Sequence, residues 1–140
     1  MKRLIFESGG LVRVVTPVNG VELERVAEVS VPLGVDWRVI DVDELPDRVY
    51  WGAWSLSGGG VVVDMVKARG IHRDSLRVLR KPLLDAADVD YLKAVEVGDS
   101  VAVAAVVARK QALRDVTKHE SIESAQAPEE LKLAVPDVLR

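Results

Sequence analysis

Hydrophobic and polar residues alternate along the first 63 residues, in short segments separated by glycine-rich turns. A period of two predicts β-strands, and the glycines supply the positive φ angles that tight hairpin turns require. Residues 21–28 have the spacing of one short helical turn, which ends before Pro32. We therefore expect a small antiparallel β-sandwich or barrel. Its expected strands are Lys2–Glu7, Leu11–Thr16, Val35–Asp43, Arg48–Ser57 and Val61–Asp64.

From Asp64 onward the apolar residues recur every three or four positions, which predicts amphipathic helices. Asp64 is a suitable N-cap for a first helix, and Pro82 is expected to kink or divide that helix. Gly98 ends the helix, and a second one follows over residues 101–116 as an antiparallel neighbour. The apolar face of the first helix consists of Met65, Ala68, His72, Leu76, Leu79, Leu83 and Ala86.

Two short helices are expected after residue 116. Thr117 and Glu120 have the spacing of a capping box for the first, and Pro128 suits the first turn of the second. The chain is therefore expected to have an α+β fold, with strands first and helices after them. We place the boundary at residue 63, which gives a β-rich domain of residues 1–63 and an α-helical domain of residues 64–140.

The composition is typical of a folded chain, since 49% of its 140 residues are hydrophobic. A net charge of −3 gives no general attraction to nucleic acids or anionic membranes. No apolar run approaches the ~20 residues of a membrane span, and Glu7 interrupts the N-terminus before a signal sequence could form. The absence of cysteine excludes thiol catalysis and disulfides. We expect a soluble, cytoplasmic protein with no membrane partner.

His72-Arg73-Asp74 matches the triplet that opens the catalytic loop of protein kinases. That loop is not helical, and an asparagine five residues after the aspartate binds the metal ion. Here Leu79 occupies that position, and no glycine-rich phosphate loop accompanies the triplet. We interpret the triplet as structural, with His72 facing a neighbouring helix and with Arg73 and Asp74 in solvent.

Other catalytic and metal-binding patterns are also missing. Residues 57–60 lack the Gly-Lys-Ser/Thr ending of a phosphate loop and are typical of a hairpin turn. His72 and His119 have no second ligand at metal spacing, and the aspartates of residues 85–90 lack the glycine and glutamate of an EF-hand. We therefore expect no enzymatic activity, no catalytic residue, no cofactor and no metal.

Arg73, Arg77 and Arg80 fall close to one helix face, a pattern that occurs in helices that bind nucleic acid. Acidic residues in the same domain cancel this charge, and no aromatic stacking platform accompanies the arginines. A solvated face or a protein contact is the favoured interpretation. Nucleic-acid binding stays as the weaker alternative, and we expect no nucleic-acid partner.

Three of the six aromatic residues of the chain lie within residues 50–54. In a strand, Tyr50 and Trp54 share one face while Trp51 takes the other. Both faces cannot be the core of so small a sheet, so one side packs inward. The other side covers the domain junction or is an exposed anchor for a partner. We therefore take Tyr50, Trp51 and Trp54 as candidate partner-binding residues.

Two faces of the helical half are candidates for contact between copies of the chain. Two helices and two short ones bury little apolar surface alone, so we expect these faces to pack against other copies. One face is a stripe of small residues that permits close helix approach, formed by Val101, Ala105, Ala108 and Ala112. The other is an apolar face formed by Leu76, Leu79 and Leu83.

Five segments together resemble small proteins of phage and prophage tail gene clusters, among them tail fibre assembly chaperones. The segments are ELPDRVYWGAW, GGGVVVDMVKARGIHRDSLR, KPLLDAADVDYLKAVEVGD, VVARKQALRDVT and APEELK. The resemblance covers roughly residues 40–135 well and the first forty residues, which begin MKRLIF, only loosely. It rests on helix-packing and capping patterns.

The resemblance implies a chaperone that binds a trimeric tail fibre in the host cytoplasm and protects it during folding and trimerisation, without ATP. The β-rich domain would bind the client, and the helical domain would hold copies of the chaperone together. Because the client is trimeric, the simplest partner is a homotrimer in a 3:3 complex. The alternative is a permanent structural component of the phage tail or baseplate.

Overall fold

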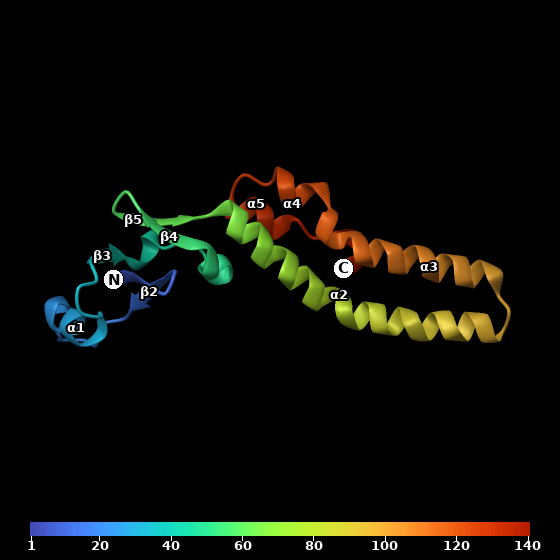
Figure 1. Cartoon of the computed structure of the whole chain (residues 1–140), viewed down its shortest axis with the longest axis horizontal. Coiled ribbons are helices and arrows are strands. Elements are labelled where there is room, and N and C mark those ends of the chain that lie inside the picture. The colour runs from blue at the N-terminus through green and yellow to red at the C-terminus, as the bar shows by residue number, and fades with distance from the viewer. The chain divides into compact units, whose positions relative to one another are not determined.

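The computed structural model describes all 140 residues, and the chain divides into two compact units. The N-terminal unit is Met1–Ala68 and the C-terminal unit is Arg69–Arg140. Strands occur only in the first unit, and the long helices follow them in the chain (Figure 1). The predicted α+β fold is therefore confirmed. No helix combines the length and apolar character needed to cross a membrane.

The N-terminal unit is built on a three-stranded antiparallel sheet in the order β2-β1-β3. Its strands are β1 Lys2–Ser8, β2 Leu11–Val15 and β3 Trp37–Asp41. β1 and β2 form the expected hairpin, whose turn residues Gly9 and Gly10 have φ angles of 62° and 74°. Residues with a side chain rarely adopt such angles, so the turn depends on glycine.

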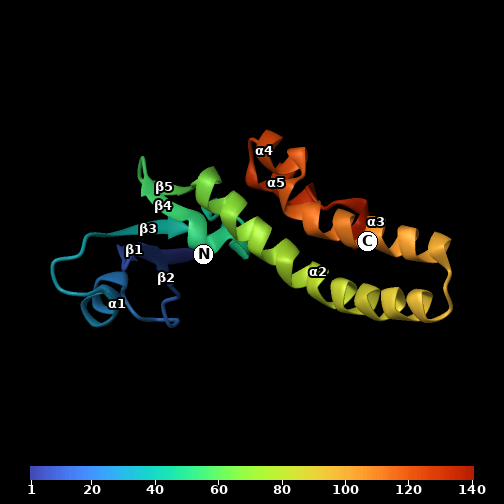
Figure 2. The same cartoon turned by 45° about the vertical axis from the view of Figure 1, so that its right-hand side comes forward.

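Both faces of this sheet are covered, which explains why three consecutive residues of β1 are buried. The second hairpin, β4 Trp54–Ser57 and β5 Gly60–Val63, packs on one face, and helix α1 Leu23–Ser30 packs on the other (Figure 2). The core on the hairpin side is formed by Ile5, Val12, Ile40 and Trp54. The core on the helix side is formed by Leu4, Phe6 and Ala27.

The segment before β4 differs from the expected strand. Arg48–Ala53 forms short 3-10 turns that are interrupted by a kink at Tyr50, and the strand begins only at Trp54. The carboxylate of Asp47 accepts a hydrogen bond from the Val49 N–H at 2.9 Å, which starts the helical turn. The strand prediction was therefore wrong for Arg48–Ala53, because this local cap outweighs the aromatic β-propensity.

The C-terminal unit is dominated by a helical hairpin. Helix α2 Met65–Glu96 begins in the last residues of the N-terminal unit, and α3 Ser100–Asp115 runs back beside it. Gly98, with φ of 68°, makes the turn, and the Asp99 carboxylate accepts from the Ala102 N–H at 3.0 Å. Pro82 lies inside α2 and does not divide it, although the ribbon bends near its middle (Figure 1).

Short helices follow α3 and complete the core of the C-terminal unit. They are the 3-10 turn Val116–Lys118, α4 Glu120–Ser124, α5 Pro128–Leu133 and the 3-10 turn Asp137–Leu139. α5 starts at Pro128 as predicted. The capping box at Thr117 is not formed, because Thr117 lies within a 3-10 turn and His119 caps α4 instead. The fully buried side chains include Leu76, Leu113, Ile122 and Leu131.

Candidate interaction surfaces

The kinase-like triplet makes contacts within its own unit. His72 is buried, and its Nε2 lies 2.8 Å from the carbonyl oxygen of Ala134. Arg73 does not lie free in solvent as expected, because its Nε donates to the carbonyl oxygen of Thr117 at 3.2 Å. Asp74 is exposed and pairs with Arg77 one turn away. Each member of the triplet therefore has a position that helix packing explains.

Arginines of α2 donate hydrogen bonds to backbone carbonyl oxygens at the end of α3 and in the segments that follow it. Arg69 donates to the carbonyl oxygens of Ile122 and Ala125, at 3.2 and 2.9 Å. Arg80 donates to the carbonyl oxygen of Arg114 at 2.8 Å. Carbonyl groups at helix ends lack partners inside their own helix, so arginines satisfy them here. Sequence reasoning missed this role, because the pattern shows the helix face and not the carbonyls opposite it.

The three aromatic candidates of the N-terminal unit differ in exposure. Tyr50 and Trp54 are 1% and 2% exposed, so neither offers its ring to a partner. Trp51 is 40% exposed, and its indole Nε1 donates to the carbonyl oxygen of Val12 at 2.7 Å. Burial raises the pKa of the Tyr50 hydroxyl, and the nearby Asp47 carboxylate raises it further. Of the three, Trp51 alone stays a candidate anchor that a partner could touch.

A pocket of about 280 Å³ lies beside Trp51, between Val14, Arg48 and Trp54. The Nε1 of Trp54 is buried and has no hydrogen-bond acceptor within the chain. A buried donor without an acceptor is rare in folded proteins and calls for a cause. The pocket thus combines an aromatic wall with the cationic side chain of Arg48. This chemistry suits an oxygen acceptor with an adjacent apolar group.

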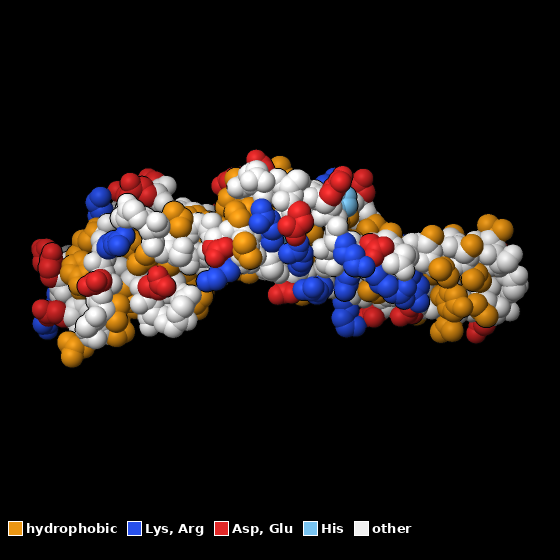
Figure 3. Space-filling model, turned by 45° about the horizontal axis from the view of Figure 1, so that its top comes forward, with side chains coloured by type: hydrophobic (Ala, Val, Ile, Leu, Met, Phe, Trp, Pro, Cys, Tyr) orange, Lys and Arg blue, Asp and Glu red, His pale blue; other side chains and the backbone are white.

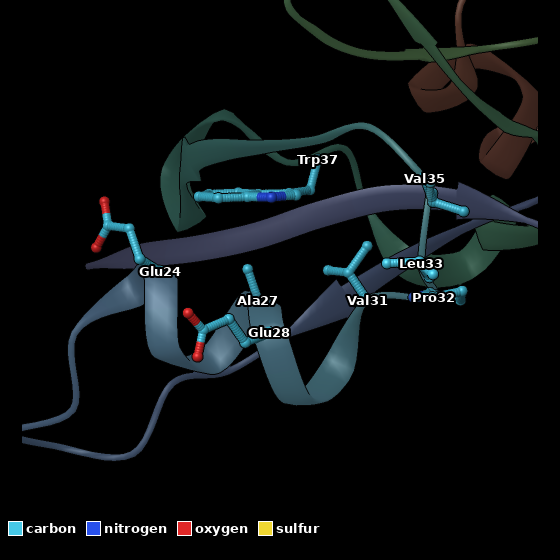
Figure 4. A pocket seen from close by; sticks show the side chains of 9 residues that line it. Glu24, Ala27, Glu28, Val31, Pro32, Leu33, Val35 and Trp37 are labelled. Carbon is cyan, nitrogen blue, oxygen red and sulfur yellow. The ribbon is translucent and has the colours of Figure 1, made fainter.

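A second, more open groove of about 470 Å³ lies between the end of α1 and the start of β3 (Figure 4). The Trp37 ring lies above Ala27 and faces α1, while Glu24 and Glu28 stand on the helix side (Figure 4). Leu33 in the connecting loop is fully exposed. The sequence analysis did not select this groove, because its residues come from a helical turn and a strand with no shared motif.

The distal part of the helical hairpin, residues 88–112, exposes large apolar side chains on both of its helices, and we call it the arm. Ala94 is the only hydrophobic residue of the arm with a buried side chain. Figure 3 shows hydrophobic side chains gathered at this end of the hairpin, at the right of the view. Exposed large apolar residues of the arm are Val89, Leu92, Val95, Val97, Val101 and Val107.

The residues predicted to join copies of the chain fall into two groups. Leu76 is fully buried in its own unit, so it is not available to another copy, whereas Leu79 is 52% exposed and Leu83 is partly buried. The second group lies on α3 within the arm. Val101 is 79% exposed, and the alanines of this stripe are exposed as well, namely Ala105, Ala108 and Ala112.

Charged residues gather where the arm joins the rest of the unit. Lys110 Nζ lies 2.6 Å from a carboxylate oxygen of Asp88, and Arg109 Nη1 lies 3.6 Å from Asp90. The hydrogen bond from Lys110 lowers the pKa of the Asp88 carboxyl below its ordinary value. Lys110 also lies 5.3 Å from the centre of the Tyr91 ring. These contacts join α2 to α3 at the base of the arm.

No group of three or more His, Cys, Asp or Glu side chains is arranged to hold a metal ion. The features that stand out are therefore two apolar recesses on the N-terminal unit and the exposed arm of the C-terminal unit.

Comparison with models of protein families, with curated proteins and with solved structures finds no match for this chain.

Proposed function

We propose that this chain is a tail fibre assembly chaperone that binds its client through the N-terminal unit and acts without ATP. The resemblance of residues 40–135 to proteins of phage tail gene clusters gives the class of client. A fibre that has not yet trimerised exposes apolar surface and unpaired strand edges, which promote misassembly. A partner that covers these groups prevents misassembly by binding alone.

The observation that carries this proposal is the pocket beside Trp51. The partly exposed Trp51 indole supplies an apolar wall, and the exposed Arg48 guanidinium supplies donors for an oxygen acceptor. An unpaired strand of a client offers the matching chemistry, because its backbone carbonyls accept hydrogen bonds and its side chains are apolar. Tryptophan and arginine are also the residues that most often dominate binding energy at protein interfaces.

Co-expression with a trimeric tail fibre protein tests the proposal. The full-length chain should convert insoluble fibre into a soluble complex. Trp51→Ala and Arg48→Met should each reduce the soluble fraction, because each removes one wall of the pocket. Val62→Ala is the matched control, since Val62 is similarly exposed, at 45%, and does not line the pocket.

Arg48→Met keeps the test valid if Trp51→Ala fails to fold, because Arg48 is exposed and Trp51 also bonds to Val12. If both variants still solubilise the fibre fully, the client does not bind at this pocket.

Purified phage particles separate the chaperone from the alternative of a tail or baseplate component. A chaperone should be absent from finished particles, whereas a structural component should be present at a fixed copy number.

A further inference from the structure

Strand β3 forms an open edge of the three-stranded sheet, because β1 is its only paired neighbour. Successive residues of an antiparallel strand turn their N–H and C=O groups to opposite sides. The Val42 N–H donates to the Met1 carbonyl oxygen at 2.8 Å, which fixes this alternation for the register of β1 and β3. Trp37 and Val39 therefore direct their backbone groups away from β1, and no other segment of the chain bonds to them. Such an edge is a template for a further strand.

The open part of this edge has a definite end. The Asp41 N–H donates to the Glu44 carboxylate at 3.2 Å, and the Asp41 carboxylate pairs with the amino group of Met1 at 3.0 Å. These contacts close the edge after Val39. A segment that pairs with Trp37 and Val39 gains both backbone hydrogen bonds of each residue.

The side chains of the same two residues lie on the face of the sheet that carries the groove between α1 and β3. Trp37 is opposite Phe6 and Val39 is opposite Leu4, and the core on the α1 side contains Leu4 and Phe6. Trp37 lines the groove, and Val39 is 41% exposed. A strand added to this edge therefore places every second side chain at the groove.

The groove is apolar at one end and acidic at the other (Figure 4). Val31 and Leu33 lie where α1 leads into β3, whereas Glu24 stands on the first turn of α1, at the opposite end. Glu24 forms no salt bridge, and Glu28 pairs with Arg25 at 3.1 Å on the exposed side of the helix. No lysine or arginine lines the groove. It therefore suits an apolar side chain that lies next to a positively charged one.

We propose that β3 and the groove bind an extended segment of another protein, which adds a strand antiparallel to β3 and carries a basic residue two positions before an apolar residue. The chain reverses between α1 and β3, so Val39 lies toward the Glu24 end of the groove (Figure 4). The basic residue lies opposite Val39, and the apolar residue lies opposite Trp37. Backbone pairing supplies affinity, and the two side chains supply specificity. The site is separate from the pocket beside Trp51, so the inference goes beyond the proposed function and does not depend on it.

A second copy of this chain fits the edge less well than a foreign segment. Its own β3 brings Trp37 and Val39 to the groove but no basic side chain, because Arg38 points to the other face of the strand. It also adds its own Glu24 and Glu28 on the same side of the sheet, and like charges brought together at an interface oppose binding. Charge complementarity therefore favours a basic partner.

A synthetic peptide tests the proposal with the full-length chain and without any fibre. The fluorescent peptide Ser-Thr-Lys-Thr-Leu-Thr-Ser carries the expected pattern, and fluorescence anisotropy measures its dissociation constant. Replacing its lysine by glutamate should weaken binding roughly ten-fold, because the charge beside Glu24 changes sign. Methylating the backbone nitrogens of its lysine and leucine should weaken binding roughly ten-fold or more, because neither can then donate to β3.

Variants of β3 locate the binding. Val39→Pro removes the outward N–H and keeps the hydrogen bonds to β1, because proline is tolerated on an edge strand where the N–H faces solvent. It should weaken binding of the unmodified peptide roughly ten-fold, whereas the matched control Val39→Thr keeps the N–H and should bind within about two-fold of the original chain. Circular dichroism checks that both variants fold. If Val39→Pro does not fold, the methylated peptide tests the same hydrogen bonds.

Three results overturn the proposal. The first is equal binding of the lysine and glutamate peptides, or no binding of either. The second is undiminished binding of the methylated peptide. The third is a lower light-scattering mass of the folded Val39→Pro chain without peptide, which shows that a second copy already occupies the edge.

Discussion

The Nε2 of His72 lies 2.8 Å from the carbonyl oxygen of Ala134, which joins the first half of α2 to the residue that follows α5. Both residues are buried. Arg69 and Arg73 make similar bonds to carbonyl oxygens of the segments after α3. The polar side chains of α2 that resemble a catalytic triplet or a nucleic-acid-binding face in the sequence therefore hold the C-terminal segments in place.

Replacing His72 by Ala should destabilise the chain by about 1–3 kcal/mol, because the carbonyl of Ala134 loses a hydrogen bond in a buried site. Urea unfolding followed by circular dichroism measures this change in the free energy of unfolding. Asp74→Asn is the matched control within the triplet. Asp74 is exposed, so the control should change stability by no more than about 0.5 kcal/mol. A folded Asp74→Asn protein that has lost its function would contradict the structural interpretation of the triplet.

Replacing Arg69 by Met should destabilise α4, since the carbonyl groups of Ile122 and Ala125 both lose their donor. We expect a loss of about 1–3 kcal/mol and faster amide hydrogen exchange in residues 120–125. Arg77→Met is the control, because Arg77 forms only an exposed pair with Asp74. That control should cost about 1 kcal/mol or less. Equal effects of the two substitutions would mean that the carbonyl contacts of Arg69 contribute nothing.

Leu76 and Leu79 lie one turn apart on the same predicted apolar face but differ in burial. Leu76→Ala should cost about 2–5 kcal/mol, because Leu76 is fully buried. Leu79→Ala should cost about 1 kcal/mol or less, because the side chain is 52% exposed. Thermal or urea unfolding at low protein concentration checks both values. Similar costs would show that Leu79 is covered in solution by a surface that the single chain does not supply.

The Asp88 carboxyl should titrate below its ordinary pKa of 3.8, because Lys110 donates a hydrogen bond to it. The pKa is lower in the folded chain, so the stabilisation is present above the ordinary pKa and is lost as the pH falls through the folded value. Carbon-detected NMR titration of the carboxyl group measures this shift. Lys110→Met should raise the pKa toward 3.8. An unchanged pKa in that variant would exclude Lys110 as the cause.

The helices and most strands could be predicted from the sequence, because periodicity and glycine positions report local geometry. The 3-10 turns of Arg48–Ala53 could not, since the cap at Asp47 outweighed the β-propensity of the aromatic residues. The burial of Leu76 and the exposure of Leu79 also depend on which short helices cover α2. Which of two apolar residues on one helix is buried depends on segments that are distant in the chain. The hydrophobic period of that helix gives no information about those segments.

The same limit applies to the candidate surfaces. The aromatic cluster could be found from composition, but the sequence did not show that Trp51 alone of the three is exposed. The groove beside Trp37 had no signal, because α1 and β3 contribute to it from separate segments. The small-residue stripe of α3 was visible, since residues 100–108 lack charge on every face.

The central claim is that three copies of this chain bind one trimeric tail fibre. The mass of the purified complex of this chain with the fibre tests that claim most directly. Three equivalent client surfaces are most simply occupied by three equivalent copies about one axis. Multi-angle light scattering of the co-expressed complex should therefore give the mass of three fibre chains and three copies of this chain. A complex with one copy per fibre trimer, or copies that cannot be cross-linked to one another within the complex, would contradict the account.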